Sequence, residues 1–318
     1  MSKPRVFEIH FDDDSPSSIY LPGSLLSGRV RFVLDEPLAM KCLRLIFDGR
    51  AHVEWSGSDK NKKREIFNDE HLFFEKQIIL WGHSRLKKNP VQKIMASGEH
   101  TFTFKFPIPA TNLPGNFNDF YGHIRYLVKA HMDTFGYKTE KPFTILPIYD
   151  LNLEPRARMV QQRNATRTIG CWVCTGGEIE CHVHVPRAGY VRDQTIQVTA
   201  KVQNHSMVAI RRISIQLLQK TTFKIEADSP NELRKALSKI LVQVSKRESL
   251  RPGRSEQIDV GLKVPAAAIA PATVDKRTCR IIQIEYFVAA EIVPRGCAGP
   301  FVVEVPVIIG TVPLQLGD

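Results

Sequence analysis

The sequence is poor in the residues and motifs that mark several large protein classes. Only 6 of its 318 residues are cysteines, too few for a fold built on disulfides, and a reducing compartment would keep them as thiols. No apolar run approaches the roughly 20 residues that a membrane-spanning helix needs. The N-terminal stretch has no apolar signal-peptide core and turns acidic at Asp12. We therefore expect a globular protein of the cytoplasm.

Sequence motifs of enzymes are missing as well. There is no glycine-rich phosphate loop, no HExxH helix and no GxSxG elbow. Residues 12–14 (DDD) and His123 supply acid–base groups, but nothing in the sequence places two such groups at one site. We therefore expect a protein that is not an enzyme and that carries no cofactor.

Acidic residues are outnumbered, with 33 against 44 basic residues and a net charge of +11. The excess is uneven, because residues 1–150 carry a net charge of +3 and residues 151–318 carry +8. A basic surface of this kind favours anionic partners such as lipid headgroups and acidic or phosphorylated peptides. The alternative is that the basic residues are scattered and serve solubility alone.

The pattern that dominates the chain is an alternation of apolar and polar residues with a period of two. It is clearest over residues 43–55 (LRLIFDGRAHVEW) and recurs at residues 7–11, 102–106, 195–202 and 213–218. Side chains alternate across a strand, so each stretch predicts a sheet with one buried and one wet face. Frequent turn clusters between many such strands indicate antiparallel β sandwiches. We expect an all-β fold.

One segment follows a helical pattern instead. Residues 229–241 (SPNELRKALSKIL) begin with a capping box formed by Ser229 and Glu232, with Pro230 at the first helical position. Apolar residues then recur at helical spacing. This pattern predicts one or two turns of helix, followed by a strand over residues 239–248.

Residues 151–167 show no sustained period and no acid after Glu154. We place the linker between two domains there, which gives an N-terminal sandwich over residues 1–150 and a C-terminal sandwich over residues 168–318. The linker is basic, and its arginines are Arg156, Arg158, Arg163 and Arg167.

The stretch CWVCTGGEIECHVHV at residues 171–185 holds residue types that bind zinc. If residues 178–185 form a strand, Cys181 faces one side, and His182 and His184 face the other. Cys171 and Cys174 then remain as a pair, which is too few to close a structural zinc site. We therefore expect a core thiol with solvent-facing histidines and no bound metal.

Several stretches resemble, in order, the strands of the α-arrestins, the arrestin-domain-containing proteins. They are LLSGRVRFVL, LRLIFDGRAHVEW, EHLFFEKQIILWG, LPGNFNDFYGHIRYLVKAHMD, the CWVC…GY opening of the second half, IEYFVAAEI and VEVPVIIGTVPL. The resemblance implies the arrestin fold, two tandem immunoglobulin-like antiparallel β sandwiches. It also implies a cytosolic adaptor, recruited to the plasma membrane and endosomes, that binds receptors or transporters and promotes their ubiquitin-dependent endocytosis and trafficking.

The sequence departs from the family in its proline motifs. α-Arrestins recruit HECT-type ubiquitin ligases through PPxY motifs that bind WW domains, whereas this sequence has no PP dipeptide and only LPIYD at residues 146–150. We expect ligase binding only if a PPxY tail exists beyond Asp318; a tail-less member and a truncated chain both remain open. One α-arrestin binds thioredoxin through a cysteine, and that residue does not map onto Cys279, so a redox partnership stays an alternative.

Basic residues in loops, the linker and the segment around residues 229–248 are the candidate site for an anionic partner, because such segments stay exposed. The partner is a cytosolic segment of a membrane protein or an anionic membrane surface, and not nucleic acid. The alternative function is an anionic-lipid or phosphoinositide scaffold. The candidate residues are Lys62, Lys63, Arg64, Lys87, Lys88, Arg156, Arg158, Arg163, Arg167, Lys235, Lys239, Lys246 and Arg247.

Overall fold

The computed structural model describes residues 4–13, 18–58, 64–82, 93–133, 136–171, 174–226, 233–246, 249–266, 271–296 and 298–315. These residues form twenty strands and two short 3-10 helices, and they divide into two compact units. The expected all-β fold is confirmed. Among the described residues, no helix has the length and apolar character to span a bilayer.

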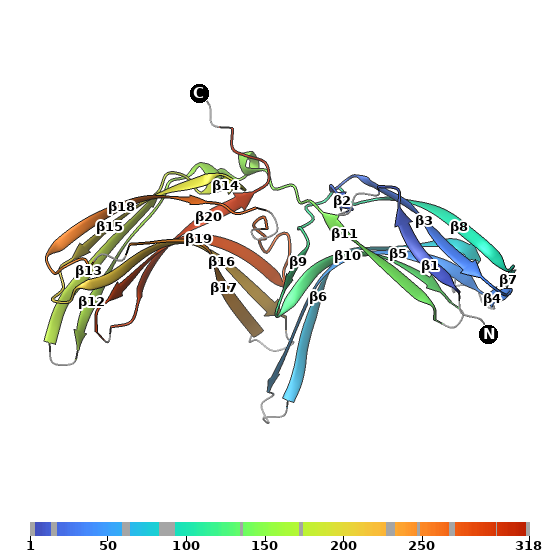
Figure 1. The fold of residues 1–318 in the computed structure, drawn as a ribbon, viewed down its shortest axis with the longest axis horizontal. Coiled ribbons are helices and arrows are strands. Elements are labelled where there is room, and N and C mark those ends of the chain that lie inside the picture. The colour runs from blue at the N-terminus through green and yellow to red at the C-terminus, as the bar shows by residue number, and fades with distance from the viewer. Residues whose placement is uncertain are drawn as a thin grey trace. The chain divides into compact units, whose positions relative to one another are not determined.

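The first unit comprises Met1–Pro147 together with the short segments Lys224–Leu233 and Thr278–Ile281. Its strands are β1 (Val6–Phe11), β2 (Ile19–Tyr20), β3 (Leu25–Leu34), β4 (Leu38–Met40), β5 (Cys42–Ser58), β6 (Arg64–Gly82), β7 (Lys93–Met95), β8 (Gly98–Pro107), β9 (Phe117–Asp119), β10 (Gly122–Met132) and β11 (Lys138–Ile145). They form one sheet in the order β1-β3-β8 and another in the order β2-β11-β10-β5-β6, with β9 beside β10 and a separate β4-β7 pair (Figure 1).

The core of the first unit is built by the residues that the alternation assigns to the buried face. Phe47 of β5 is fully buried and stacks on Phe106 of β8, with ring centroids 4.1 Å apart. Tyr126 of β10 is also buried, and its hydroxyl donates to the carbonyl of Pro114 at 2.7 Å. Aromatic side chains from both sheets therefore close the sandwich, and the opposite face of β5 and β10 is left for polar residues.

The second unit comprises Ile148–Phe223, Arg234–Arg277 and Ile282–Asp318. Its elements are η1 (Leu151–Leu153), η2 (Pro155–Arg158), β12 (Gln161–Cys171), β13 (Cys174–Val185), β14 (Gly189–Val191), β15 (Thr195–Asn204), β16 (Ile210–Ile225), β17 (Leu233–Lys246), β18 (Arg254–Lys263), β19 (Ile282–Pro294) and β20 (Phe301–Gly310). The sheet orders are β12-β13-β15-β18 and β14-β20-β19-β16-β17 (Figure 1). The interior is rich in Ile and Val, which suit a pleated buried surface.

Two sequence predictions differ from the structure. The helix expected over residues 229–241 is wrong where the structure describes that segment, because β17 begins at Leu233; residues 229–232 lie outside the described residues. Residues 151–167, expected as an irregular linker, contain η1, η2 and more than half of β12. Both β12 and β17 are the last strands of their sheets, where side chains are less buried and the alternation that reveals a strand is weak.

Candidate functional site

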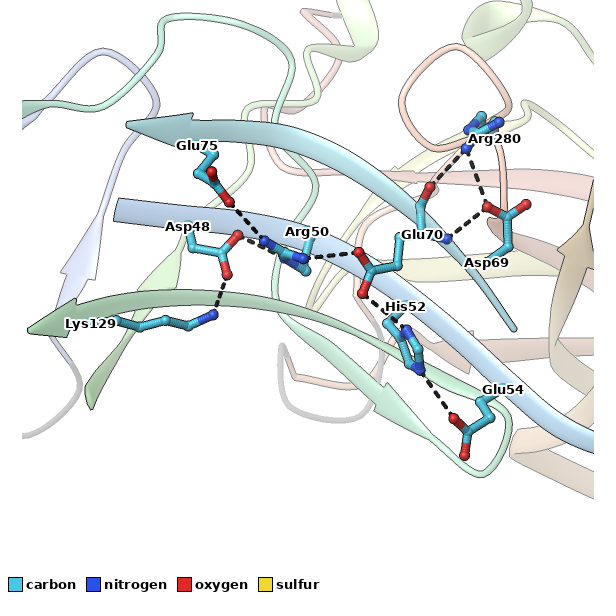
Figure 2. A network of polar contacts seen from close by, with 9 residues as sticks. All are labelled: Asp48, Arg50, His52, Glu54, Asp69, Glu70, Glu75, Lys129 and Arg280. Atoms are coloured by element: carbon cyan, nitrogen blue, oxygen red, sulfur yellow. Dashed lines mark hydrogen bonds and ion pairs between the residues drawn. The ribbon is translucent and has the colours of Figure 1, made fainter. Parts of the chain in front are cut away.

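A network of charged side chains covers the polar face of β5, β6 and β10 in the first unit (Figure 2). At its centre Asp48 of β5 is only 1% exposed. Its carboxylate accepts a hydrogen bond from Arg50 Nε at 2.8 Å and a second from Lys129 Nζ of β10. A buried carboxylate is tolerated when its oxygens are paired in this way, so Asp48 joins β5 to β10 from the outer face of the sheet.

Arg50 connects this centre to the neighbouring strand β6. Its Nη1 donates to Glu70 at 2.9 Å and its Nη2 donates to Glu75 at 3.1 Å. Burial alone would lower the pKa of Arg50, but the hydrogen bond and charge of Asp48, followed by those of Glu70, raise it above the usual value. The guanidinium therefore stays charged and holds three carboxylates together.

A β-bulge makes this arrangement possible. Glu70 and Glu75 are five residues apart, so a regular strand would send them to opposite faces of the sheet. The pairing of β5 with β6 shifts between Gly49 and Arg50, so that Asp48 lies opposite Glu75 while His52 lies opposite Glu70. The extra residue brings both glutamates to the face that carries Arg50.

Gly49 at this bulge is a position where a side chain has no room. A Cβ atom there would lie 2.7 Å from the rings of both Phe74 and Tyr126. Those two rings stack across the strands, with centroids 5.9 Å apart. The glycine therefore lets the aromatic core approach the backbone directly beneath Arg50.

The network continues through two histidines toward the end of the sheet. His52 Nδ1 lies 3.4 Å from Glu70, and its Nε2 lies 3.8 Å from Glu54. The His52 ring lies 5.5 Å from that of His123 on β10. Burial first, and then the charges of Arg125 and His52, lower the pKa of His123 to about 4. His123 is therefore neutral at physiological pH and adds no charge to the cluster.

Arg280 ties two late segments of the chain to β6 within the first unit (Figure 2). Its guanidinium pairs with Asp69 at 3.3 Å, donates to the carbonyl of Glu70 at 2.7 Å, and pairs with Glu226. The backbone amide of Glu226 in turn donates to Asp69 at 3.0 Å. The backbone amide of Arg280 donates to His71 Nδ1 at 3.0 Å, and burial followed by the Arg280 charge lowers the pKa of His71. This cluster anchors Glu226 and Arg280 on β6.

The chemistry of the network is that of a structural ion-pair cluster. Each carboxylate around Arg50 and Arg280 faces at least one cation. Among the described residues, no group of three or more His, Cys, Asp or Glu side chains is arranged to hold a metal ion. The alternation over residues 43–55 places Asp48, Arg50 and His52 on the polar face of β5, but this local pattern gives no signal for the partners on β6 and β10.

The strand that carries the cysteine–histidine stretch follows the expected parity. Cys181 of β13 is fully buried, and burial raises the pKa of its thiol to about 12. His182 and His184 lie on the opposite face of β13 and are partly exposed. The two sets of ligand atoms therefore point away from each other.

The candidate basic residues lie on several different elements. Arg64 begins β6; Arg156 and Arg158 lie in η2; Arg163 and Arg167 lie in β12; and Lys235, Lys239 and Lys246 lie in β17. Lys62, Lys63, Lys87, Lys88 and Arg247 lie outside the described residues.

Some of these basic side chains are engaged within the second unit. Arg156 pairs with Glu154 at 2.8 Å, Arg167 donates to the carbonyls of Gly299 and Pro300 at 3.0 and 2.6 Å, and Lys246 pairs with Glu256 of β18. Arg158 makes a longer contact with Asn152 at 3.4 Å. These contacts stabilise local structure, and they make each cation less available for binding an anionic partner.

The side chains of four candidates, by contrast, form no ion pair or hydrogen bond with another described residue: Arg64, Arg163, Lys235 and Lys239. Three of them belong to the second unit, and these three do not lie on one surface. Arg163 lies on β12, the end strand of one sheet, which contacts β20. Lys235 and Lys239 lie on β17, the end strand of the other sheet, which is linked to β18 by Lys246 and Glu256. Because β12 and β18 are the two ends of one sheet, β12 and β17 lie at opposite edges of the sandwich. The basic residues therefore divide between two edges, and the β17 edge carries Lys235 and Lys239.

Comparisons with known proteins cover both units. Residues 7–152 match the family model of the arrestin (or S-antigen) N-terminal domain, and residues 175–314 match that of the C-terminal domain. The chain is 26% identical to arrestin domain-containing protein 17 of Caenorhabditis elegans over 96% of this chain and 70% of that protein. It is 24% identical to human arrestin domain-containing protein 4 over 95% of this chain and 70% of that protein. A more distant relative is thioredoxin-interacting protein of Sus scrofa, which is 23% identical over 97% of this chain and 75% of that protein. With two tandem sandwiches that match both arrestin domains in order, the chain belongs to the α-arrestin family.

Proposed function

We propose that this α-arrestin is a cytosolic adaptor that binds cytosolic segments of membrane receptors or transporters and promotes their ubiquitin-dependent endocytosis and trafficking. The observation that carries the proposal is the match of both arrestin domains over residues 7–152 and 175–314. Adaptor function needs an accessible recognition surface rather than a catalytic site, and the described side chains form a structural network in place of an acid–base pair.

We place the contact with cargo on the exposed basic residues. Among the described candidates, Lys235 and Lys239 carry the strongest case, because they are exposed neighbours on one strand and are not neutralised by a described carboxylate. Basic side chains on a surface increase the rate of encounter with acidic segments and with the inner membrane leaflet. Arg163 lies on β12 at the other edge of the sandwich, so a variant at Arg163 serves as the control for variants at Lys235 and Lys239.

Ligase recruitment belongs to the proposal only for a form of the protein that carries a PPxY segment. A WW domain binds an extended proline-rich segment in an aromatic groove, and the sequence contains no such motif. The LPIYD stretch lacks the first proline. In the structure it follows β11 and ends at Asp150, which forms an isolated bridge with Val312.

The experiment compares two kinds of vesicle made from the same phosphatidylcholine and phosphatidylserine mixture. One kind displays tethered cytosolic tails from a panel of receptors and transporters, and the other displays none. We expect the purified chain to co-float with particular tails, and we expect K235E/K239E to weaken this binding while R163E leaves it unchanged. Equal binding to tail-free vesicles would instead support the alternative of an anionic-lipid scaffold.

The redox alternative has less support from the structure. Cys42, Cys181 and Cys279 are thiols, and all three are buried. Thiol–disulfide exchange requires an accessible thiolate. A name such as thioredoxin-interacting protein describes that relative, and Cys42, Cys181 and Cys279 of this chain offer no exposed sulfur of that kind.

A further inference from the structure

The end strand β17 offers an open edge of the second unit. It is the last strand in the order β14-β20-β19-β16-β17 and pairs with β16 on one side. Among the described residues no strand is hydrogen-bonded to its other side, and Lys246 at its end contacts β18. An end strand presents a row of unpaired N–H and C=O groups, to which a further extended chain can pair. With bounds at Leu233 and Lys246, β17 is longer than most strands and has no glycine or proline inside it.

The side chains of β17 divide into two rows with different chemistry. Gln243 and Ser245 contact Gln216 and Ser214 of β16, at 3.4 and 2.9 Å. By alternation, Lys235 and Lys239 belong to the same row as these polar residues, and Leu233, Leu237 and Leu241 lie in that row between and beside the lysines. The opposite row begins with Arg234, Ala236 and Ser238, continues with Ile240, Val242 and Val244, and ends at Lys246. The Ile240 and Val244 side chains are 51% and 41% exposed, an unusual exposure for consecutive β-branched residues of one row.

The charge of β17 determines which extended chain it can accept. The strand carries four basic residues and no acidic residue. Two copies of β17 placed side by side would bring like charges together, and like charges opposite one another destabilise a strand pair. Lysines on an end strand are a known protection against pairing between copies. The basic residues of β17 attract an acidic chain, whereas they repel a second copy of β17.

We propose that β17 binds an extended peptide segment in which acidic and aliphatic residues alternate, and that the segment adds to the sheet as a further strand beside β17. The inference rests on the proposed adaptor function and names the chemistry of one cargo segment. Acidic residues of the segment lie beside Lys235 and Lys239, and its aliphatic residues cover Ile240 and Val244. Backbone pairing supplies affinity, and the two rows supply specificity.

The probe is a dye-labelled synthetic peptide of about nine residues, the length of a long strand, in which glutamate alternates with valine and both ends are blocked. Its binding to the full chain is measured by fluorescence anisotropy. A second peptide has the same sequence with N-methyl groups on alternate backbone nitrogens, which removes hydrogen-bond donors but keeps every side chain and charge. A third has the same composition with its glutamates and valines in separate blocks.

We expect the alternating peptide to bind and the other two to bind at least tenfold more weakly, about the effect of losing one or two net hydrogen bonds. K235E/K239E should weaken binding about tenfold or more, because two attractions across the strands become repulsions. R163E on β12 makes the same kind of change at an exposed cation of the other edge and should leave binding within about twofold. Amide hydrogen exchange of β17 should slow in the complex.

The peptide series keeps the inference testable even if a variant folds poorly, since it uses the unaltered protein. Equal binding of the N-methylated peptide would overturn strand addition and leave only charge attraction. Failure of the alternating peptide to bind would overturn the inference. If the peptide fails while tethered cargo tails still bind, the adaptor function stands without this site. If the peptide binds while no tail does, the adaptor function fails and the β17 site stands.

Discussion

Replacing Asp48 by asparagine tests the centre of the charged network in the first unit. Asparagine has nearly the same shape, so packing is retained while the negative charge is lost. Asp48 is 1% exposed, and its carboxylate accepts from two cations whose side chains are about a quarter exposed, 28% for Arg50 and 26% for Lys129. The amide of the introduced asparagine can accept at one oxygen only, and its NH2 group faces a cation.

The expected cost follows from this geometry. Removing one partner of a fully buried ion pair costs about 3–5 kcal/mol, but Arg50 keeps Glu70 and Glu75, and both cations reach solvent. We therefore expect a loss of about 2 kcal/mol, the range of one hydrogen bond to a charged group. For a unit of this size that loss lowers the melting temperature by roughly 4–8 °C. The assay is differential scanning calorimetry of the full chain, with urea unfolding as a second measurement.

The matched control is E75Q, which removes an ion pair of the same network at its exposed rim. The Glu75 side chain is 53% exposed, and such pairs contribute about 0–1 kcal/mol. The double variant D48N/K129Q should lose less than the sum of the two single variants, because each removes the same contact. If D48N costs no more than E75Q, the buried carboxylate is not what holds β5 to β10, and the reasoning is wrong.

Three further predictions concern other groups of the described chain. Because burial lowers the pKa of His123 below its unfolded value to about 4, the unfolded state binds the extra proton first, and stability is lost as pH falls from about 6.5 toward 4; H123Q should flatten this part of a stability–pH curve, and an unchanged slope would assign the proton to another group. R280A should speed amide exchange at Glu226 more than at β10, because the Asp69–Arg280–Glu226 contacts hold that segment; equal rates in variant and parent would contradict this role. The Cys181 thiol, buried and with its pKa raised to about 12, should resist iodoacetamide at pH 8 in the native protein and react after unfolding; peptide mapping by mass spectrometry decides, and labelling of the native protein would show that β13 opens.

The sequence was most informative where one face of a strand is buried deeply. Over residues 43–55 the alternation assigned Phe47 and Val53 to the core, and both are fully buried. The same local signal placed Cys181 inside and its neighbouring histidines outside. Burial of one face imposes a period of two on the sequence, so these strands can be predicted without knowledge of their partners.

The network around Arg50 was not predictable because its contacts are made between distant strands. Lys129 lies 81 residues from Asp48, and the glutamates share a face with Arg50 through a bulge. A bulge reverses the parity of every residue beyond it, so the sequence of β6 alone assigns Glu70 and Glu75 to opposite faces. Only the pairing with β5 shows that they converge.

The end strands explain the remaining errors, and they also explain why the sequence of β17 predicts a helix. Leu233, Leu237 and Leu241 are four residues apart, a spacing that places side chains on one face of a helix and equally on one face of a strand. In a strand with one buried face, apolar and polar residues would alternate along the sequence. β17 buries neither face completely, so its sequence lacks this alternation. The positions of its lysines and β-branched residues are therefore not fixed by packing in a core. The exposure that makes β17 hard to recognise from the sequence is the same property that leaves its backbone edge, Lys235 and Ile240 open to a partner.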